Sequence, residues 1–431
     1  MKRSIVITLL QSTIGRYIGM VLTFLTMSLM AHKLGISGLG EYSISFGVAS
    51  SFCYLVGLGA PEGLVKLIET NKERPFNRIR LVCLSHLFSI GTAVFAVIIL
   101  YIISLLVEIS NTLFFTVVWV VAWGCNISAS QSLNAIKEER LGVLFFYSLT
   151  ALTSAIIGIV SVLYGEHDVS VIIQRTAIAF CCLAIVSSFV LYRKICSSEN
   201  SVNSQQITVW RLICTGMPFS VGRFIQAVIL WAPVWLAEVL HSKDAAGISA
   251  ALIRLGVAFG ALMAATRFVF RRWFVQELNK NKVQLLSILL STLGSLVSFL
   301  AVIAAIFILL IGKPILTILF GYDVGEYNWL MALILLGIAI EAQFGVAEDL
   351  LRNAHYIHQT LILQTLALGV QLVIGYILFS VFGWPAVIYG YLIQLILYQS
   401  LLAIWLRRYL RIELRPIYSL RAFKLIMKLK H

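Results

Sequence analysis

The sequence predicts an all-α integral membrane protein with about twelve transmembrane helices in two pseudo-symmetric six-helix bundles. Of its 431 residues, 60% are apolar and only 12% are charged, against about 45–50% and about 25% in soluble domains. The apolar residues form runs of about twenty, the length that a helix needs to cross a bilayer. The two halves of the chain also share a weak internal repeat. These observations exclude a soluble enzyme.

Short polar breaks separate the apolar runs, and long runs rather than short alternating strands exclude an outer-membrane barrel. The predicted spans are residues 5–31, 42–66, 81–104, 113–134, 144–164, 171–192, 212–238, 247–270, 285–311, 327–350, 358–381 and 385–406.

The spans divide the chain into four predicted parts. Residues 1–192 form an N-terminal six-helix bundle, and the polar segment 193–210 is a cytoplasmic linker. Residues 211–406 form the second bundle, and 407–431 form a basic cytoplasmic tail. An amphipathic basic tail of this kind is expected to lie on the anionic lipids of the inner leaflet.

The repeat relates the first span of each half. Thr13–Arg16 matches Ser220–Arg223, and the same shift in numbering brings Gly40 onto Gly247. Both spans run in the same direction, which predicts a parallel repeat of two bundles with a substrate handled between them. Chance similarity between apolar helices is the alternative.

Basic residues set the predicted orientation. Of the 33 Lys and Arg residues, 25 lie on the side of the termini, three lie in the opposite loops, and the rest lie within spans. The positive-inside rule therefore predicts that both termini are cytoplasmic. The net charge of +14 is accounted for by a membrane surface, so no nucleic acid partner is expected.

Arginines within the spans are the candidate substrate-binding residues: Arg16, Arg223, Arg254 and Arg267. An arginine at the bilayer centre costs about 2.5–3.5 kcal/mol, so the deep ones are expected to face protein or a water-filled cavity. Glu341 is the midplane carboxylate, and it cannot neutralise three deep guanidinium groups. An anionic ligand, which guanidinium binds through paired hydrogen bonds, would make up the deficit.

Alternative roles remain open for these residues. Arg16 or Arg223 could form a structural ion pair with Glu341, and Arg267 could extend to the inner head groups. Glu341 is either a protonatable ion-coupling site or the partner of a cavity arginine.

Prolines mark candidate hinges, because proline removes a helix hydrogen bond and permits bending. Pro61 lies in the glycine-rich end of the second span, and Pro218 and Pro233 flank Arg223. A static kink is the alternative.

Several chemical signatures are missing from the sequence. It has no phosphate-binding glycine loop, metal-ligand cluster or nucleophile elbow, and most of its seven cysteines lie inside apolar runs. No cofactor, no metal and no enzymatic activity are expected.

Residues 32–42 read HKLGISGLGEY. This segment resembles the pattern between the first two spans of polysaccharide transporters in the MOP superfamily: a basic residue, Leu-Gly, then Gly-x-Tyr or Gly-x-Phe. The segment from Leu58 to Lys66 is similar to the family's continuation. Two departures are Lys33 where arginine is common and Ile36-Ser37 where Pro-Glu is common.

The resemblance implies a MATE/MOP-like pair of bundles and an alternating-access flippase in the bacterial inner membrane. Such a flippase moves an undecaprenyl-diphosphate-linked glycan, such as an O-antigen repeat unit in lipopolysaccharide biosynthesis, to the periplasmic leaflet. Coupling to H⁺ or Na⁺, and a polysaccharide polymerase and chain-length proteins as partners, belong to the same expectation. The alternatives are a drug or cation antiporter of the superfamily and a membrane-embedded glycosyltransferase or polymerase.

Overall fold

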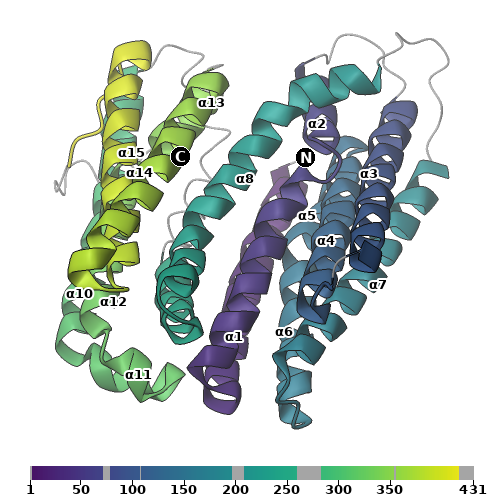
Figure 1. Ribbon diagram of the computed structural model, residues 1–431. Helices are drawn as coiled ribbons and strands as arrows, with labels where there is room; N and C mark the ends of the chain where they lie inside the picture. Colours follow the sequence, from purple (N-terminus) through teal and green to yellow (C-terminus); the bar gives the residue numbers. More distant parts are fainter. Residues whose placement is uncertain are drawn as a thin grey trace. The chain divides into compact units, whose positions relative to one another are not determined.

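The computed structural model describes residues 2–70, 78–106, 108–196, 208–259, 283–353 and 356–416. All regular secondary structure in these ranges is helical (Figure 1). A backbone that crosses a bilayer must satisfy its own N–H and C=O groups, which a helix does within one segment. Each of the twelve predicted spans falls wholly or partly on a described helix, so the predicted fold class is confirmed.

The elements of the N-terminal half include one 3₁₀ turn, η1, and one π-helix, η2. They are α1 (Lys2–Phe52), η1 (Cys53–Leu55), α2 (Ala60–Thr70), α3 (Arg78–Leu106), α4 (Asn111–Ala135), α5 (Glu139–Val143), η2 (Leu144–Leu149), α6 (Thr150–Leu163) and α7 (Val169–Cys196).

In the C-terminal half, a helix over 243–259 follows the first element. The elements with complete bounds are α8 (Val209–Leu240), α10 (Val283–Phe320), α11 (Tyr322–Gly325), α12 (Asn328–Phe344), α13 (Val346–Asn353), α14 (Ile357–Phe382) and α15 (Ala386–Leu410).

Nine helices in the described ranges are long and apolar enough to cross a membrane, and a bent pair, Val21–Leu55 with Ala60–Ile68, would add a tenth. The chain is therefore a multi-pass membrane protein. The first two predicted spans are joined within α1, where Gly35 (φ 74°, ψ 173°) makes a kink. The tenth predicted span is two helices, α12 and α13, which meet at Gly345.

The chain forms two compact units, Met1–Trp231 and Ala232–His431. The division falls inside α8, because the first part of α8 packs into the first unit. Leu212 and Ile213 are buried there in one apolar cluster with residues of α2, α3, α4 and α7. Part of the predicted linker, 197–207, lies outside the described residues.

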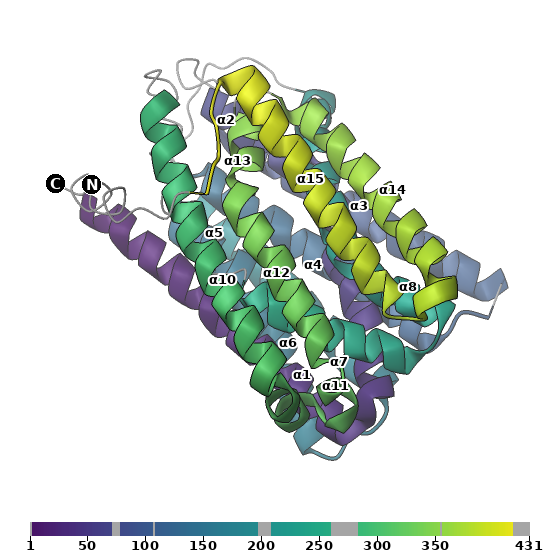
Figure 2. The ribbon, with the colours of Figure 1, turned by 90° about the vertical axis from the view of Figure 1, so that its left-hand side faces the viewer.

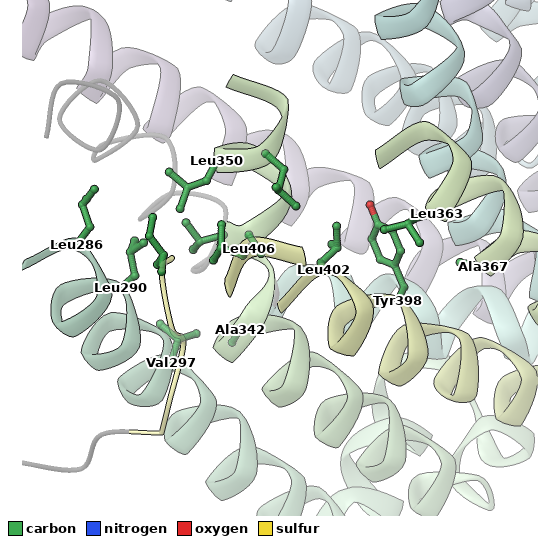
Figure 3. Packing of buried hydrophobic residues seen from close by; sticks show 14 residues of the cluster. Leu286, Leu290, Val297, Ala342, Leu350, Leu363, Ala367, Tyr398, Leu402 and Leu406 are labelled. Atoms are coloured by element: carbon green, nitrogen blue, oxygen red, sulfur yellow. The ribbon is translucent and has the colours of Figure 1, made fainter. Parts of the chain in front are cut away.

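Within the first unit, α4 packs against α1, α3 and α7. Within the second unit, α12 lies between α10 and α15, and α14 packs on α15 (Figure 2). Figure 3 shows the apolar cluster that joins these helices. Its members include Leu286, Leu290, Val297, Ala342, Leu350, Leu363, Ala367, Tyr398, Leu402 and Leu406.

Candidate functional site

Irregular backbone separates α1 from α2. After η1, three consecutive residues have positive φ: Gly57 (79°), Leu58 (47°) and Gly59 (84°). Pro61 is the second residue of α2, where its fixed φ suits the first helical turn. One freed backbone group is satisfied by a side chain of α3, since the Gly57 N–H donates to Thr92 Oγ1 at 3.0 Å. The candidate hinge at Pro61 therefore adjoins a broken helix.

Glycines bring the backbone of α8 into contact with this break. A Cβ added at Gly216 would overlap the carbonyl oxygen of Gly59. A Cβ added at Gly63 would likewise overlap the carbonyl oxygen of Leu212. Only glycine permits both approaches, so Gly63 and Gly216 mark the place where α8 crosses the start of α2.

This crossing places Arg223 beside Glu62. Arg223 Nη1 donates to Glu62 Oε1 at 2.7 Å, and its guanidinium carbon lies 5.9 Å from the ring centres of both Tyr54 and Phe146. The hydroxyl of Ser220, one turn earlier on α8, donates to the Tyr54 carbonyl. The Glu62 side chain is 11% exposed and that of Arg223 is 36% exposed, so the guanidinium group is partly open.

The π-helix η2 supplies one of these rings. Its wider turn interrupts the ordinary pattern of helix hydrogen bonds, and π-helical turns are frequent at functional sites. Asn126 Nδ2 of α4 donates to the carbonyl of Phe145 at 3.0 Å. This bond anchors η2 next to Phe146, the residue that lies against the guanidinium group.

Helix α1 approaches the same π-helix. A Cβ added at Gly19 would lie 3.8 Å from the Tyr147 carbonyl oxygen. The backbone of Arg16 is about one turn earlier on α1. The first unit therefore brings α1, near Arg16, and α8, at Arg223, to one π-helix.

The other candidate charges belong to the second unit. Arg254 is half-buried on the helix over 243–259, and Gly256 of that helix packs against Ile334 of α12. Glu341, also half-buried, follows two turns later on α12. Arg267 lies outside the described residues.

Pro218 and Pro233 lie inside α8, which runs from Val209 to Leu240 as one helix, and their role as hinges stays a prediction. Arg223 forms its ion pair with Glu62. Glu62 lies in the glycine-rich segment that marked the hinge, but the sequence carried no signal for the rings of Tyr54 and Phe146. Among the described residues, no group of three or more His, Cys, Asp or Glu could hold a metal ion.

No family model and no curated protein matches the chain, but solved structures do. The inward-facing structure of a multidrug resistance MATE family transporter of the MOP superfamily covers 91% of this chain and 94% of its own, at 13% identity and a TM-score of 0.61. The structure of the MATE multidrug transporter DinF-BH covers 93% of this chain and 94% of its own, at 12% identity and a TM-score of 0.61. A variant of the Vibrio cholerae MATE transporter VcmN covers 95% of this chain and 98% of its own, at 12% identity and a TM-score of 0.54. The protein is an α-helical membrane protein with the MATE fold.

Proposed function

We propose that this protein is a flippase that moves undecaprenyl-diphosphate-linked oligosaccharide, an O-antigen or similar repeat unit, from the cytoplasmic to the periplasmic leaflet by alternating access. The observation that carries the proposal is the partly open guanidinium group of Arg223, held within a membrane-spanning helix. The MATE fold supports the transport step.

Arg223 has the capacity to bind a diphosphate. A guanidinium group carries five N–H donors, and Glu62 accepts from Nη1. The remaining donors suit phosphate oxygens, which guanidinium binds bidentately. The faces of Tyr54 and Phe146 lie near the distance limit of about 6 Å for cation–π attraction and flank the guanidinium group.

Arg16 lies on α1 near the approach of that helix to the same π-helix. Arg254 and Arg267 remain substrate-binding candidates from the sequence. An inside-negative potential favours outward movement of negative charge by about 2.3 kcal/mol per charge per 100 mV. Glu341 is the candidate for coupling to H⁺ or Na⁺, and a polymerase and chain-length proteins would act on the exported glycan.

The fold neighbours are named as multidrug transporters, which favours the second candidate, a drug or cation antiporter. Excess carboxylate favours a cation site. The Glu62–Arg223 pair is neutral, and Arg16 of the same unit adds a positive charge, so an anionic substrate is the better match.

Reconstitution in proteoliposomes tests the proposal. The probe is a polyprenyl-diphosphate oligosaccharide labelled with NBD on its sugar, and dithionite added outside bleaches only the label on the outer leaflet. Wild-type protein should make the inner-leaflet label accessible as well. Arg223→Ala should leave that label protected. Arg223→Lys keeps the charge but not the paired N–H donors of guanidinium, so it should flip the probe more slowly than wild type.

Arg175→Ala is the matched control, because Arg175 pairs with Glu166 at 3.0 Å at an exposed helix end. It should flip the probe at the wild-type rate. If Arg223→Ala and Arg223→Lys both flip like wild type, Arg223 has no part in transport. The wild-type protein could instead leave the inner-leaflet label protected and export ethidium under an imposed Na⁺ or pH gradient. That result would refute the flippase proposal and support the antiporter.

A further inference from the structure

Four arginines and one glutamate lie at the end of α15 and in the segment that follows it. Arg407 Nε pairs with Glu413 Oε1 at 2.9 Å, and Arg415 pairs with the other carboxylate oxygen. Arg408 and Arg411 are exposed and form no ion pair with any residue that the structure describes. Positive charge therefore exceeds negative charge by three at this end of the second unit.

The segment after α15 is attached to the unit. Arg411, with φ 55°, ends the helix in the left-handed conformation, and Ile412 is fully buried in the cluster drawn in Figure 3. The Glu413 carbonyl accepts a hydrogen bond from Ser287, and the Arg415 N–H donates to Ser291 Oγ at 3.0 Å. The arginines are thus presented from a backbone that is fixed to α10.

An exposed apolar stripe on α15 leads to these arginines. Ile393, Leu397 and Ile404 are exposed, and helical spacing puts them on one face. Arg408 follows Ile404 by one turn on that face, and Arg411 comes next. An apolar stripe that ends in guanidinium groups without an ion-pair partner in the described part of the chain matches the outline of a phospholipid, with acyl chain and phosphate in that order.

Aromatic residues lie at the same level. The half-exposed Tyr409 packs on Tyr356, with ring centres 4.7 Å apart, and on Trp405 at 5.7 Å. Tyrosine and tryptophan are enriched at the boundary between hydrocarbon and head groups. The arginines therefore lie where phosphate groups of a bilayer are expected.

We infer that Arg408 and Arg411, together with the stripe Ile393, Leu397 and Ile404, form a binding site for an anionic phospholipid of the inner leaflet. The guanidinium groups bind the phosphodiester of a head group that carries no compensating cation, and one acyl chain lies along the stripe. The occupant is a lipid rather than a free phosphate, because an acyl chain packs on the apolar stripe and a free phosphate makes no favourable contact with it. None of its residues belongs to the proposed transport site at Arg223.

The test uses the full-length protein in detergent, with dioleoyl phosphatidylglycerol as probe and native mass spectrometry to count bound lipids. The Arg408→Gln/Arg411→Gln variant leaves the Glu413 ion pairs in place. Each basic residue near an anionic surface changes affinity about fivefold, so the variant should lose about 25-fold. Dioleoyl phosphatidylcholine should bind weakly to both proteins.

Arg193→Gln is the matched control, because Arg193 is an exposed arginine in the last turn of α7 in the first unit. It should keep the wild-type affinity for phosphatidylglycerol. Undiminished binding by the Arg408→Gln/Arg411→Gln variant would overturn the site. Full displacement of the lipid by millimolar inorganic phosphate would overturn the lipid as occupant.

Discussion

Two Glu–Arg pairs of equal length show how surroundings separate a binding group from a structural one. Glu62–Arg223 and Glu348–Arg352 both have N···O distances of 2.7 Å. The first pair joins α2 to α8 across 161 residues of sequence. The second pair lies within α13, at positions i and i+4.

Arg223 and Arg352 differ in how far neighbouring side chains enclose them. Arg352 is 19% exposed, and Gln364 donates a further hydrogen bond to Glu348 at 3.0 Å. Arg223 is 36% exposed and lies at a helix break. The pair on α13 is thus enclosed by its own unit, whereas the pair on α8 leaves a guanidinium group accessible for a ligand.

Exchanging the charges at the α2–α8 pair gives the largest expected effect. In Glu62→Arg/Arg223→Glu the attraction is restored, but a carboxylate stands where phosphate would bind. We expect the protein to fold and flipping of the NBD-labelled probe to fall at least about 100-fold, or about 2.7 kcal/mol of activation free energy. Transport at the wild-type rate by the exchanged protein would make Arg223 a structural residue, like Arg352.

Removing Arg352 is expected to act on folding. Arg352→Ala leaves Glu348 in an enclosed site without its ion partner, which destabilises by about 2–3 kcal/mol. The measurement is the folded fraction after heating, read by size-exclusion chromatography. Lys313→Ala is the control, since Lys313 pairs with Glu326 at 2.7 Å with both side chains largely exposed, and exposed pairs contribute about 0–1 kcal/mol. Equal losses in the two variants would refute the distinction.

The fold was largely predictable because bilayer thickness sets the length of each apolar run. The break in the helix near Pro61 was predictable too, since proline removes a helix hydrogen bond. Arg223 was singled out because an arginine within a membrane span is costly, and its role in binding stays a prediction. The pairing with Glu62 was not predictable, because it depends on where α8 crosses α2. That crossing is set by a contact of Gly216 with Gly59, which no local pattern reveals.

The aromatic rings around the Arg223 guanidinium group could not be predicted from the sequence either. Phe146 reaches the guanidinium group through the π-helix η2, and an extra residue in a helical turn leaves the hydropathy of a span unchanged. The predicted span 144–164 was placed correctly, but its local geometry depends on the hydrogen bond from Asn126 of α4. Tertiary contacts therefore decided the site, while local composition decided the spans.

The backbone contact at the crossing gives a smaller expected effect. In Gly216→Ala the new Cβ meets the backbone of Gly59 and Gly63, which cannot rotate away, so we expect a loss of about 1–3 kcal/mol in stability. Gly91→Ala in α3 is the control, because a Cβ there meets nothing within 4 Å and alanine favours the helix by about 1 kcal/mol. Heating curves followed by circular dichroism should separate the two variants, and coincident curves would contradict the tight crossing.

Neutralising the glutamate of each pair gives the smallest expected effect. Glu62→Gln removes the carboxylate that competes with an anionic ligand for Arg223. The affinity for radiolabelled pyrophosphate, measured by equilibrium dialysis in detergent, should rise about fivefold, or about 1 kcal/mol. Glu348→Gln should leave that affinity unchanged, because Arg352 is enclosed within the other unit. An affinity that falls in Glu62→Gln would mean that Glu62 positions the guanidinium group for the ligand instead of competing with it.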